Sequence, residues 1–292
     1  MKKIAAVLIA SALAMIIPAV GFATDSFAAN PTASTIEELQ NLIESNLKRK
    51  NTSFVINYTA ATPSEPQEFK QSIIDAYQGA RNHLPGDILW NIKAKSASVN
   101  VKGYIGNIEI TVTTQFLTTI EQDMELENEI DRILSGLITP QMNNYQKEKA
   151  IHDYIVSTVE YADMGDLSHT VYSALFDKKA VCQGYAVLAY KMLRKAGIHN
   201  ELVYGSVNRD PDQAHLWNAV ELDGIWYMLD TTWDDPIPNG PGVRSYKYFN
   251  VTGEFLKLNM HSWDEAEYPA ARTLFDEDYH SSIDRWKETG EF

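Results

Sequence analysis

The stretch "KKAVCQGYAVLAYKMLRKAG", residues 178–197, contains the single cysteine of this 292-residue chain, Cys182. After it, apolar residues recur at the three- and four-residue spacing of a helix, and Gly197 stands where such a helix ends. The pattern predicts a largely buried helix with Cys182 in its first turn. Unpaired N–H groups and the positive end of the dipole at a helix start favour a thiolate, which is the nucleophilic form of cysteine.

A single cysteine cannot form a disulfide within its own chain, so we expect the fold to be held by packing alone. Three interpretations of the thiol follow. It is an inert buried side chain, which is the usual state of a free cysteine, or a link between two chains, or a reactive group. The residues after the helix bear on this choice.

Three strands are predicted after the helix, and the last two form a hairpin around Asp223-Gly224, a strong two-residue turn signal. The strands are "NELVYGSV" (200–207), "AHLWNAVEL" (214–222) and "IWYMLDTTW" (225–233).

The hairpin register places two polar residues close together. The turn pairs Leu222 with Ile225, and counting back along the ladder makes His215 and Asp230 diagonal neighbours on one face. A carboxylate in that place can hold the imidazole in one tautomer and stabilise its protonated form.

Each of these residues has an ordinary structural explanation when it is taken alone. A histidine on an apolar strand is usually a hydrogen-bonded core residue, and an aspartate before two threonines is usually a cap or turn former. Cys182, His215 and Asp230 together, in that order, favour nucleophilic catalysis by a cysteine.

The remaining histidines do not predict a metal site. They lack the helical ligand spacing of a zinc site, and the acidic runs "RDPD" (209–212) and "WDDP" (233–236) lack the periodicity of a calcium loop. No metal and no cofactor is therefore assigned. These histidines are His152, His169, His199, His261 and His280, together with His83, which is expected to be solvated or capping near a helix end.

Two segments, "AVCQGYAVLAYKMLRKAGIHNELVYG" (180–205) and "AHLWNAVELDGIWYMLDTTWDDP" (214–236), resemble the bacterial secreted branch of the transglutaminase-like superfamily, whose core is papain-like. The resemblance covers about residues 145–265 and includes "YFNVT" (248–252) and "HSW" (261–263). It implies an α+β fold, in which the helix that carries the cysteine packs on an antiparallel sheet that carries the histidine and the aspartate.

The resemblance also implies roles for individual residues. Cys182 is the nucleophile, His215 is the general base and acid, and Asp230 is the orienting carboxylate. Tyr161, in "VEYADMG" (159–165), is the candidate for an aromatic partner of the oxyanion, although an aromatic residue that covers the core at a helix end explains it equally well. Trp217 is expected to wall the cleft, or simply to pack there as any aromatic residue on this strand would.

These residues predict an enzyme that attacks a peptide or protein amide through a thioester intermediate, which water then hydrolyses. A cross-linking transglutaminase, in which a lysine amine replaces water, uses the same residues; hydrolysis is favoured because no feature for a second substrate is found. A third hypothesis is a binding or scaffold module of the same fold without turnover. The expected partner is a peptide or protein substrate, including one at the cell surface, and the oligomeric state is not predicted.

The beginning of the chain predicts its destination. Lys2 and Lys3 precede an almost continuous apolar run, residues 4–20, and Ser26-Phe27-Ala28 follows at the spacing that a signal peptidase recognises. We expect a signal peptide cleaved near residue 28 and a secreted protein that does not insert into the membrane. The net charge of −14 argues against nucleic-acid and anionic-lipid partners, because like charges repel.

Two domains are predicted after the signal peptide of residues 1–28. Residues 29–138 alternate helix-like and strand-like patterns and predict a small α/β domain of unknown role, with two strands joined across Lys102-Gly103. Residues 139–292 are predicted to form the transglutaminase-like catalytic domain, and its first helix is expected to begin at Thr139-Pro140.

Overall fold

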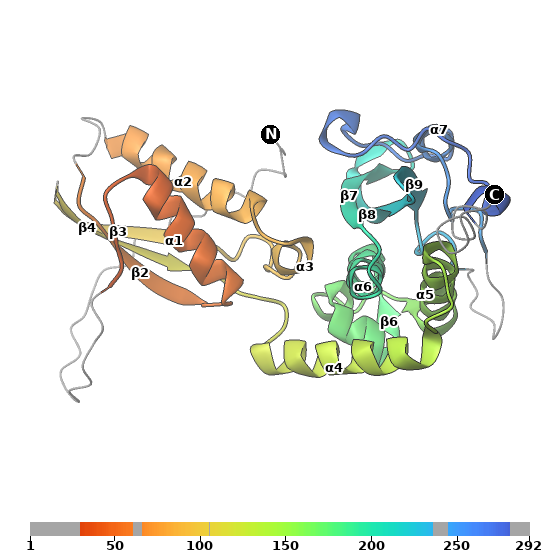
Figure 1. The fold of residues 1–292 in the computed structure, drawn as a ribbon. Coiled ribbons are helices and arrows are strands. Elements are labelled where there is room, and N and C mark those ends of the chain that lie inside the picture. The colour runs from red at the N-terminus through yellow and green to blue at the C-terminus, as the bar shows by residue number, and fades with distance from the viewer. Residues whose placement is uncertain (1–29, 61–65, 105, 236–244, 281–292) are drawn as a thin grey trace, which may run out of the picture. The chain divides into compact units, whose positions relative to one another are not determined.

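The computed structural model describes residues 30–60, 66–104, 106–235 and 245–280, and the predicted signal peptide, residues 1–28, lies outside them. The described residues form two compact units that divide between Phe116 and Leu117 (Figure 1). Helices and sheets occur in both units, so the predicted α+β class is confirmed. Within the described ranges, no helix is both long and apolar enough to span a bilayer.

The first unit is a four-stranded sheet with helices packed on it. The strand order is β1-β2-β4-β3; β1 runs parallel to β2, and the other neighbours are antiparallel. The strands are β1 (Thr32–Ala33), β2 (Ser53–Tyr58), β3 (Ser98–Tyr104) and β4 (Asn107–Thr113), and the helices are α1 (Ile36–Lys48), α2 (Pro66–Asn82) and the short α3 (Gly86–Leu89).

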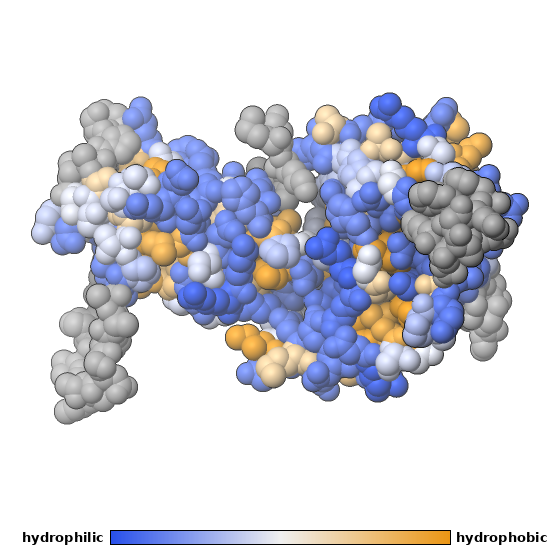
Figure 2. Space-filling model, in the orientation of Figure 1, coloured by the Kyte–Doolittle hydropathy of each residue, from blue (hydrophilic) through white to orange (hydrophobic). Residues whose placement is uncertain are grey.

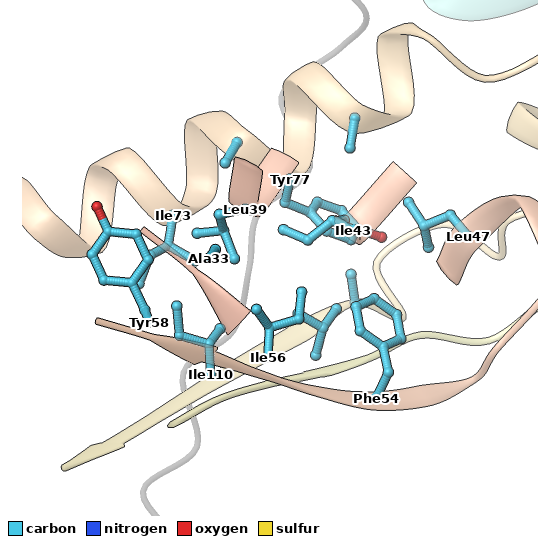
Figure 3. Close-up of a cluster of buried hydrophobic side chains, with 14 of the residues drawn as sticks. Ala33, Leu39, Ile43, Leu47, Phe54, Ile56, Tyr58, Ile73, Tyr77 and Ile110 are labelled. Atoms are coloured by element: carbon cyan, nitrogen blue, oxygen red, sulfur yellow. The ribbon is translucent and has the colours of Figure 1, made fainter. Parts of the chain in front are cut away.

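The core of the first unit lies between the sheet and the helices α1 and α2 (Figure 3). Leu39, Ile43 and Leu47 recur every four residues of α1 and therefore project from one face of the helix. Ile56 of β2 and Ile110 of β4 face each other in the ladder and belong to the same cluster. All five side chains are fully buried, so burial of apolar surface holds this unit together.

The hairpin of β3 and β4 turns later than predicted. Tyr104 pairs with Asn107, and Gly106 has a φ of +85°, a value that glycine adopts without strain. Lys102 and Gly103 are paired residues inside the ladder. The predicted join at Lys102-Gly103 is therefore wrong.

The second unit begins at Leu117, and its first helix is α4 (Ile120–Leu137). The boundary between the units thus lies before α4, whereas the sequence analysis places it after residue 138. The acidic side of α4 is paired with basic residues of α6 (Cys182–Lys195): Glu127 lies 2.6 Å from Lys191 and 2.9 Å from Lys195. Lys195 also lies 2.6 Å from Asp131. These partners come much later in the chain, so the acidic composition of α4 alone does not assign it to either unit.

The next helix, α5 (Asn144–Thr158), starts later than predicted because Asn143 caps it. The Asn143 side chain accepts a hydrogen bond from the backbone N–H of Gln146, and the Gln146 side chain accepts one from the backbone N–H of Asn143. This reciprocal capping box satisfies two N–H groups of the first turn. The predicted start at Thr139-Pro140 is therefore wrong, and these two residues lie before the helix.

The central helix of the second unit is α6, which packs against α5 and against a sheet of order β7-β8-β9 (Figure 1). On the face shown in Figure 2, the surface of each unit is mostly hydrophilic. The other elements are β5 (Glu160–Tyr161), η1 (Leu167–His169), η2 (Ser173–Asp177), β6 (Lys179–Ala180), β7 (Asn200–Val207), β8 (Asp210–Leu222), β9 (Ile225–Leu229), α7 (Gly253–Leu258) and η3 (Glu265–Glu267).

Candidate active site

Cys182 is the first residue of α6, and its side chain is half-buried. The N-cap residue is Val181, whose side chain makes no capping hydrogen bond. The helix start therefore lacks the side-chain acceptor that Ser, Thr, Asp or Asn would supply. The positive end of the α6 dipole lies at the cysteine, so negative charge that develops there during a reaction is stabilised.

The hairpin that carries the other two predicted residues has the predicted register. Leu222 pairs with Ile225 across the turn, His215 lies on β8, and Asp230 directly follows β9. His215 Nε2 is 2.8 Å from Asp230 Oδ2. Both side chains are almost completely buried, so this hydrogen bond is shielded from bulk water.

His215 also hydrogen-bonds to Cys182, so its ring connects the sulfur with the carboxylate. Burial by itself lowers the pKa of a histidine. Here the negative charge of Asp230 and the hydrogen bonds to Asp230 and Cys182 outweigh burial and raise the pKa of His215 to about 10. The imidazolium is therefore the stable form at neutral pH, and it places a positive charge beside the sulfur of Cys182.

Asp230 is held by four hydrogen bonds. Its Oδ1 accepts the backbone N–H groups of Thr232 at 3.0 Å and Trp233 at 3.1 Å. Its Oδ2 accepts from His215 at 2.8 Å and from His261 at 2.9 Å. Burial favours the neutral acid, but the charge of His215 and the bonds from both histidines hold the pKa of Asp230 well below its usual range. Asp230 is thus an ionised carboxylate in a fixed orientation.

His261 is not among the residues predicted for the site. It lies between α7 and η3, and no spacing within one element links it to His215 or Asp230. The two parts of the chain meet through a bridge between Ser206 and Ser262. The "HSW" stretch, residues 261–263, was the one sequence signal that pointed to this segment.

His215, Asp230 and His261 form the one group of described residues whose ligand atoms lie close enough for a metal ion, within 4.8 Å of one another. Both ring Nε2 atoms, however, lie at hydrogen-bonding distance from the same carboxylate oxygen. A ring nitrogen that donates a proton to a carboxylate has no lone pair for a metal. The distances therefore fit a hydrogen-bonded network.

Tyr161 lies beside the nucleophile, where an oxyanion donor is expected. β5 pairs in parallel with β6, so Tyr161 is opposite Ala180, which is two residues before Cys182. Burial and the nearby charge of Cys182 raise the pKa of Tyr161. Its hydroxyl therefore stays protonated and can donate a hydrogen bond.

Trp217 takes a different place from the expected cleft wall. Its side chain is 1% exposed and belongs to a core cluster with Val203 and Met228. Its ring stacks on that of His215, with centroids 5.8 Å apart. The rings of His261 and Trp263 pack against Trp217 and cover it. Trp217 therefore supports the imidazole of His215 from the interior of the protein.

The two aspartates of "WDDP" point inward. Asp234 Oδ2 is 3.2 Å from His152 Nε2, and Asp235 accepts a hydrogen bond of 2.5 Å from the hydroxyl of Tyr185 on α6. Both aspartates are buried. They brace the turn that follows Asp230 against α5 and α6, and their carboxylates are not presented to solvent as calcium ligands.

Comparison with known proteins assigns the segment that carries these residues. Residues 131–231 match the sequence model of the transglutaminase-like superfamily, and the match includes Cys182, His215 and Asp230. The resemblance to the transglutaminase-like superfamily is therefore confirmed for residues 131–231.

Two curated relatives are similar over a longer stretch. Kyphoscoliosis peptidase of Homo sapiens is 26% identical over 174 residues, which are 54% of this chain and 24% of the relative. Kyphoscoliosis peptidase of Mus musculus is 25% identical over 174 residues, with the same coverage. The chain thus spans about a quarter of the length of the curated relatives it matches.

Among solved structures, a crystal structure of a TGase is 16% identical and covers 87% of this chain and 71% of its own, with a TM-score of 0.38. The periplasmic domain of TgpA from Pseudomonas aeruginosa bound to ethylmercury is 15% identical and covers 50% of this chain and 68% of its own, with a TM-score of 0.30. At these TM-scores, neither likeness adds to the assignment.

Proposed function

Residues 131–231 carry a transglutaminase-like core, and we propose that the protein is a secreted cysteine hydrolase that cleaves amide bonds of peptides or proteins. The observation that carries the proposal is the imidazole of His215, which is bonded to Asp230 on one side and to Cys182 on the other. A thiol, an imidazole and a carboxylate linked in this order form the machinery of nucleophilic amide cleavage.

Acylation is the first half of the proposed reaction. The Cys182 thiolate attacks the amide carbon, forms a C–S bond and moves an electron pair onto the oxygen. The backbone N–H groups at the start of α6 and the hydroxyl of Tyr161 stabilise this oxyanion. As the C–N bond breaks, His215 gives its proton to the leaving amine, and a thioester remains.

Hydrolysis is the second half. The neutral imidazole of His215 takes a proton from water as the water oxygen attacks the thioester carbon. The C–S bond then breaks, the sulfur leaves as a thiolate, and the acid product departs. The proton remains on His215, so the ion pair with Cys182 is restored. Asp230 holds the imidazole in place throughout.

Two observations support hydrolysis of a polypeptide. The curated relatives are named peptidases, and this chain matches them over 54% of its length. The net charge of −14 supports a polypeptide partner over nucleic acid or an anionic membrane. The substrate includes proteins at the cell surface, and the described part of the chain holds no observation that favours a cross-linking reaction.

Secretion is supported by the basic start and apolar run within residues 1–28. The test is N-terminal sequencing of the protein recovered from the culture medium. We expect a chain that begins at Ala29, and a recovered protein that still begins at Met1 would contradict the signal peptide.

The reaction is tested with an unfolded, glutamine-containing protein, such as casein, mixed with a fluorescent primary amine. We expect cleavage of casein without labelling, and loss of cleavage in Cys182→Ala. Labelling that depends on Cys182 would mean cross-linking, and neither reaction with several unfolded proteins would favour a binding module.

A matched pair of histidine variants separates catalysis from folding in the same assay. His215→Gln should abolish cleavage, because the amide cannot carry the proton. His199→Gln should retain it, because His199 is largely exposed and bonded to Glu221 at 2.7 Å, away from the three catalytic residues.

A further inference from the structure

Asp230 is bound by two imidazoles, and only one of them has a role in the proposed reaction. His261 Nε2 is 2.9 Å from Asp230 Oδ2, the same oxygen that His215 Nε2 contacts at 2.8 Å. His261 is 3% exposed and lies 31 residues after Asp230. A second buried histidine on the orienting carboxylate changes the charge of the whole site.

The hydrogen bonds of His261 determine its protonation state. Its Nδ1 is 3.0 Å from the backbone carbonyl oxygen of Asn259, which can only accept a hydrogen bond. Its Nε2 faces the carboxylate of Asp230, which is ionised and also can only accept. Both ring nitrogens must therefore carry a proton, and a ring with two N–H groups is a cation.

The surroundings of His261 suit a cation. Aromatic rings lie around it, with centroid distances of 4.5 Å to Trp233, 5.2 Å to Trp217 and 5.8 Å to Tyr248. Aromatic rings attract a cation within about 6 Å, and the effect is larger when water is excluded. The aromatic surroundings and the carboxylate together offset the desolvation of the charged ring.

A glycine allows His261 to reach this place. Gly205 of β7 pairs with His215 of β8, and next to it Ser206 exchanges two backbone hydrogen bonds with Ser262, at 2.8 and 2.9 Å. A Cβ atom on Gly205 would collide with the carbonyl oxygen of Ser262. The absence of a side chain at Gly205 therefore lets the segment that carries His261 lie against the sheet beside His215.

We infer that His261 is a positioning residue, an imidazolium that clamps Asp230 through Nε2 and sets the pH range in which Cys182 and His215 form their ion pair. The inference rests on the proposed function of these residues. The titratable groups that face His261 are Asp230 and His215 from the sheet and Tyr248 from the segment before α7.

The direction of the effect follows from the charges. The cationic ring of His261 offsets part of the negative charge of Asp230. It also lies 5.6 Å from the ring of His215, and it repels His215 when His215 is an imidazolium. The same cation favours the Cys182 thiolate. Removing the charge of His261 should therefore move both the acid and the alkaline limit of the ion pair to higher pH.

The first test compares His261→Gln with His261→Phe. Glutamine can donate one hydrogen bond to Asp230 without a charge, and phenylalanine can donate none. We expect the pH midpoint of Cys182 alkylation by iodoacetamide to rise by about one unit in both variants, because each removes one positive charge from the hydrogen-bonded network that ends at the sulfur. Peptide cleavage should fall further in His261→Phe, because only glutamine still orients the carboxylate.

The matched control is His280→Gln. His280 is also a buried histidine, 2.9 Å from Asp223 and 3.0 Å from the hydroxyl of Tyr227, so the variant removes a similar buried pair without touching Asp230. Its alkylation midpoint should equal that of the wild type. An unchanged midpoint in folded His261→Gln would overturn the inference. An equal shift of the midpoint in His261→Gln and in the control His280→Gln would overturn it as well.

A second measurement needs no variant and no substrate. Nitrogen-15 NMR of the histidine rings in the wild-type protein should show protons on both ring nitrogens of His261 at neutral pH. A single unprotonated ring nitrogen would overturn the inference even if the enzyme were active. Absence of turnover with both nitrogens protonated would instead count against the proposed function alone.

Discussion

The two units of this protein have interiors of different kinds. Among the described residues of the first unit, tyrosines aside, Thr114 is the one buried polar side chain, and the rest of the core is aliphatic or aromatic. The second unit buries carboxylates and imidazoles, among them Glu148, His152, Asp230 and His261, each at most 3% exposed.

This contrast shows which interior is built for stability alone. Burial of apolar surface is enough to hold a sheet and its helices, as the first unit demonstrates. A buried charge opposes folding unless partners compensate for the water it loses. The second unit keeps such groups, pairs them, and gathers several of them around Cys182, so interior polarity locates the candidate site more sharply than topology does.

Among the variants that test this contrast between interiors, the largest effect is expected from Asp230→Asn, which removes the charge at the centre of the polar interior. Asparagine keeps the shape of the side chain but presents N–H groups to His215. Nε2 of His215 must then accept a hydrogen bond, so the ring proton moves to Nδ1, which donates toward Cys182. This is the wrong tautomer for a base. We expect kcat/KM for peptide cleavage to fall on the order of 10³- to 10⁴-fold.

Asp223→Asn is the control for that substitution. Asp223 is another nearly buried carboxylate bonded to a histidine, His280, at the turn of the same hairpin. Asp223→Asn should leave kcat/KM for peptide cleavage close to the wild-type value. Equal losses of activity in both variants would mean that any buried carboxylate of this hairpin is needed for folding.

Glu148 gives the next largest effect, and it acts on stability. Burial raises the pKa of Glu148 to about 8, and its Oε1 and the Oδ1 of Asn250 have no hydrogen-bond partner, while Asn250 Nδ2 donates to Oε2 at 2.8 Å. The ordinary pKa is 4.5, so the folded state binds this proton more tightly than the unfolded state. The free energy of unfolding should therefore fall as the pH rises from about 4.5 to about 8.

Glu148→Gln should remove that dependence, because the amide has no charge and can bond both polar atoms of Asn250. We expect the variant to be more stable than the wild type at pH 8 by on the order of a few kcal/mol, measured by urea unfolding at pH 5 and pH 8. Glu44→Gln in the first unit is the control. A hydrogen bond from Lys48 lowers the pKa of Glu44, so its contribution has the opposite sign. Parallel pH curves for wild type and Glu148→Gln would contradict the prediction.

The smallest effect tests whether the apolar interior is independent of the polar one. Ile110→Val removes one methylene from the core of the first unit and should lower its free energy of unfolding by about 1 kcal/mol. Hydrogen exchange should become faster in β2 and β4 and stay unchanged in β8 and β9. Faster exchange in all four strands would show that the two units unfold as one.

The sequence predicts local features of this fold well. The helix that begins at Cys182 follows from its own apolar spacing, and the contact between His215 and Asp230 follows from a two-residue turn. Both depend on residues near one another in the chain.

Features that depend on distant partners could not be read in this way. The ion pairs that connect α4 to the second unit involve Lys191 and Lys195, which come more than fifty residues later. The position of His261 depends on Gly205 and on the bridge between Ser206 and Ser262. The late start of α5 has a different cause. Two cap signals lie a few residues apart, and the reciprocal bonds of Asn143 with Gln146 decide between them.

The uncapped start of α6 matters for anyone who engineers a more robust form of this protein. A capping serine or aspartate in place of Val181 would add about 1 kcal/mol to the helix, but it would also replace an apolar side chain that is only 6% exposed. The new oxygen would then compete with the reacting carbonyl for the same backbone amides, and aspartate would add a repulsive charge beside the sulfur. Position 181 is therefore a poor target for thermostabilising changes, and the apolar interior of the first unit, which carries none of the catalytic residues, is a better one.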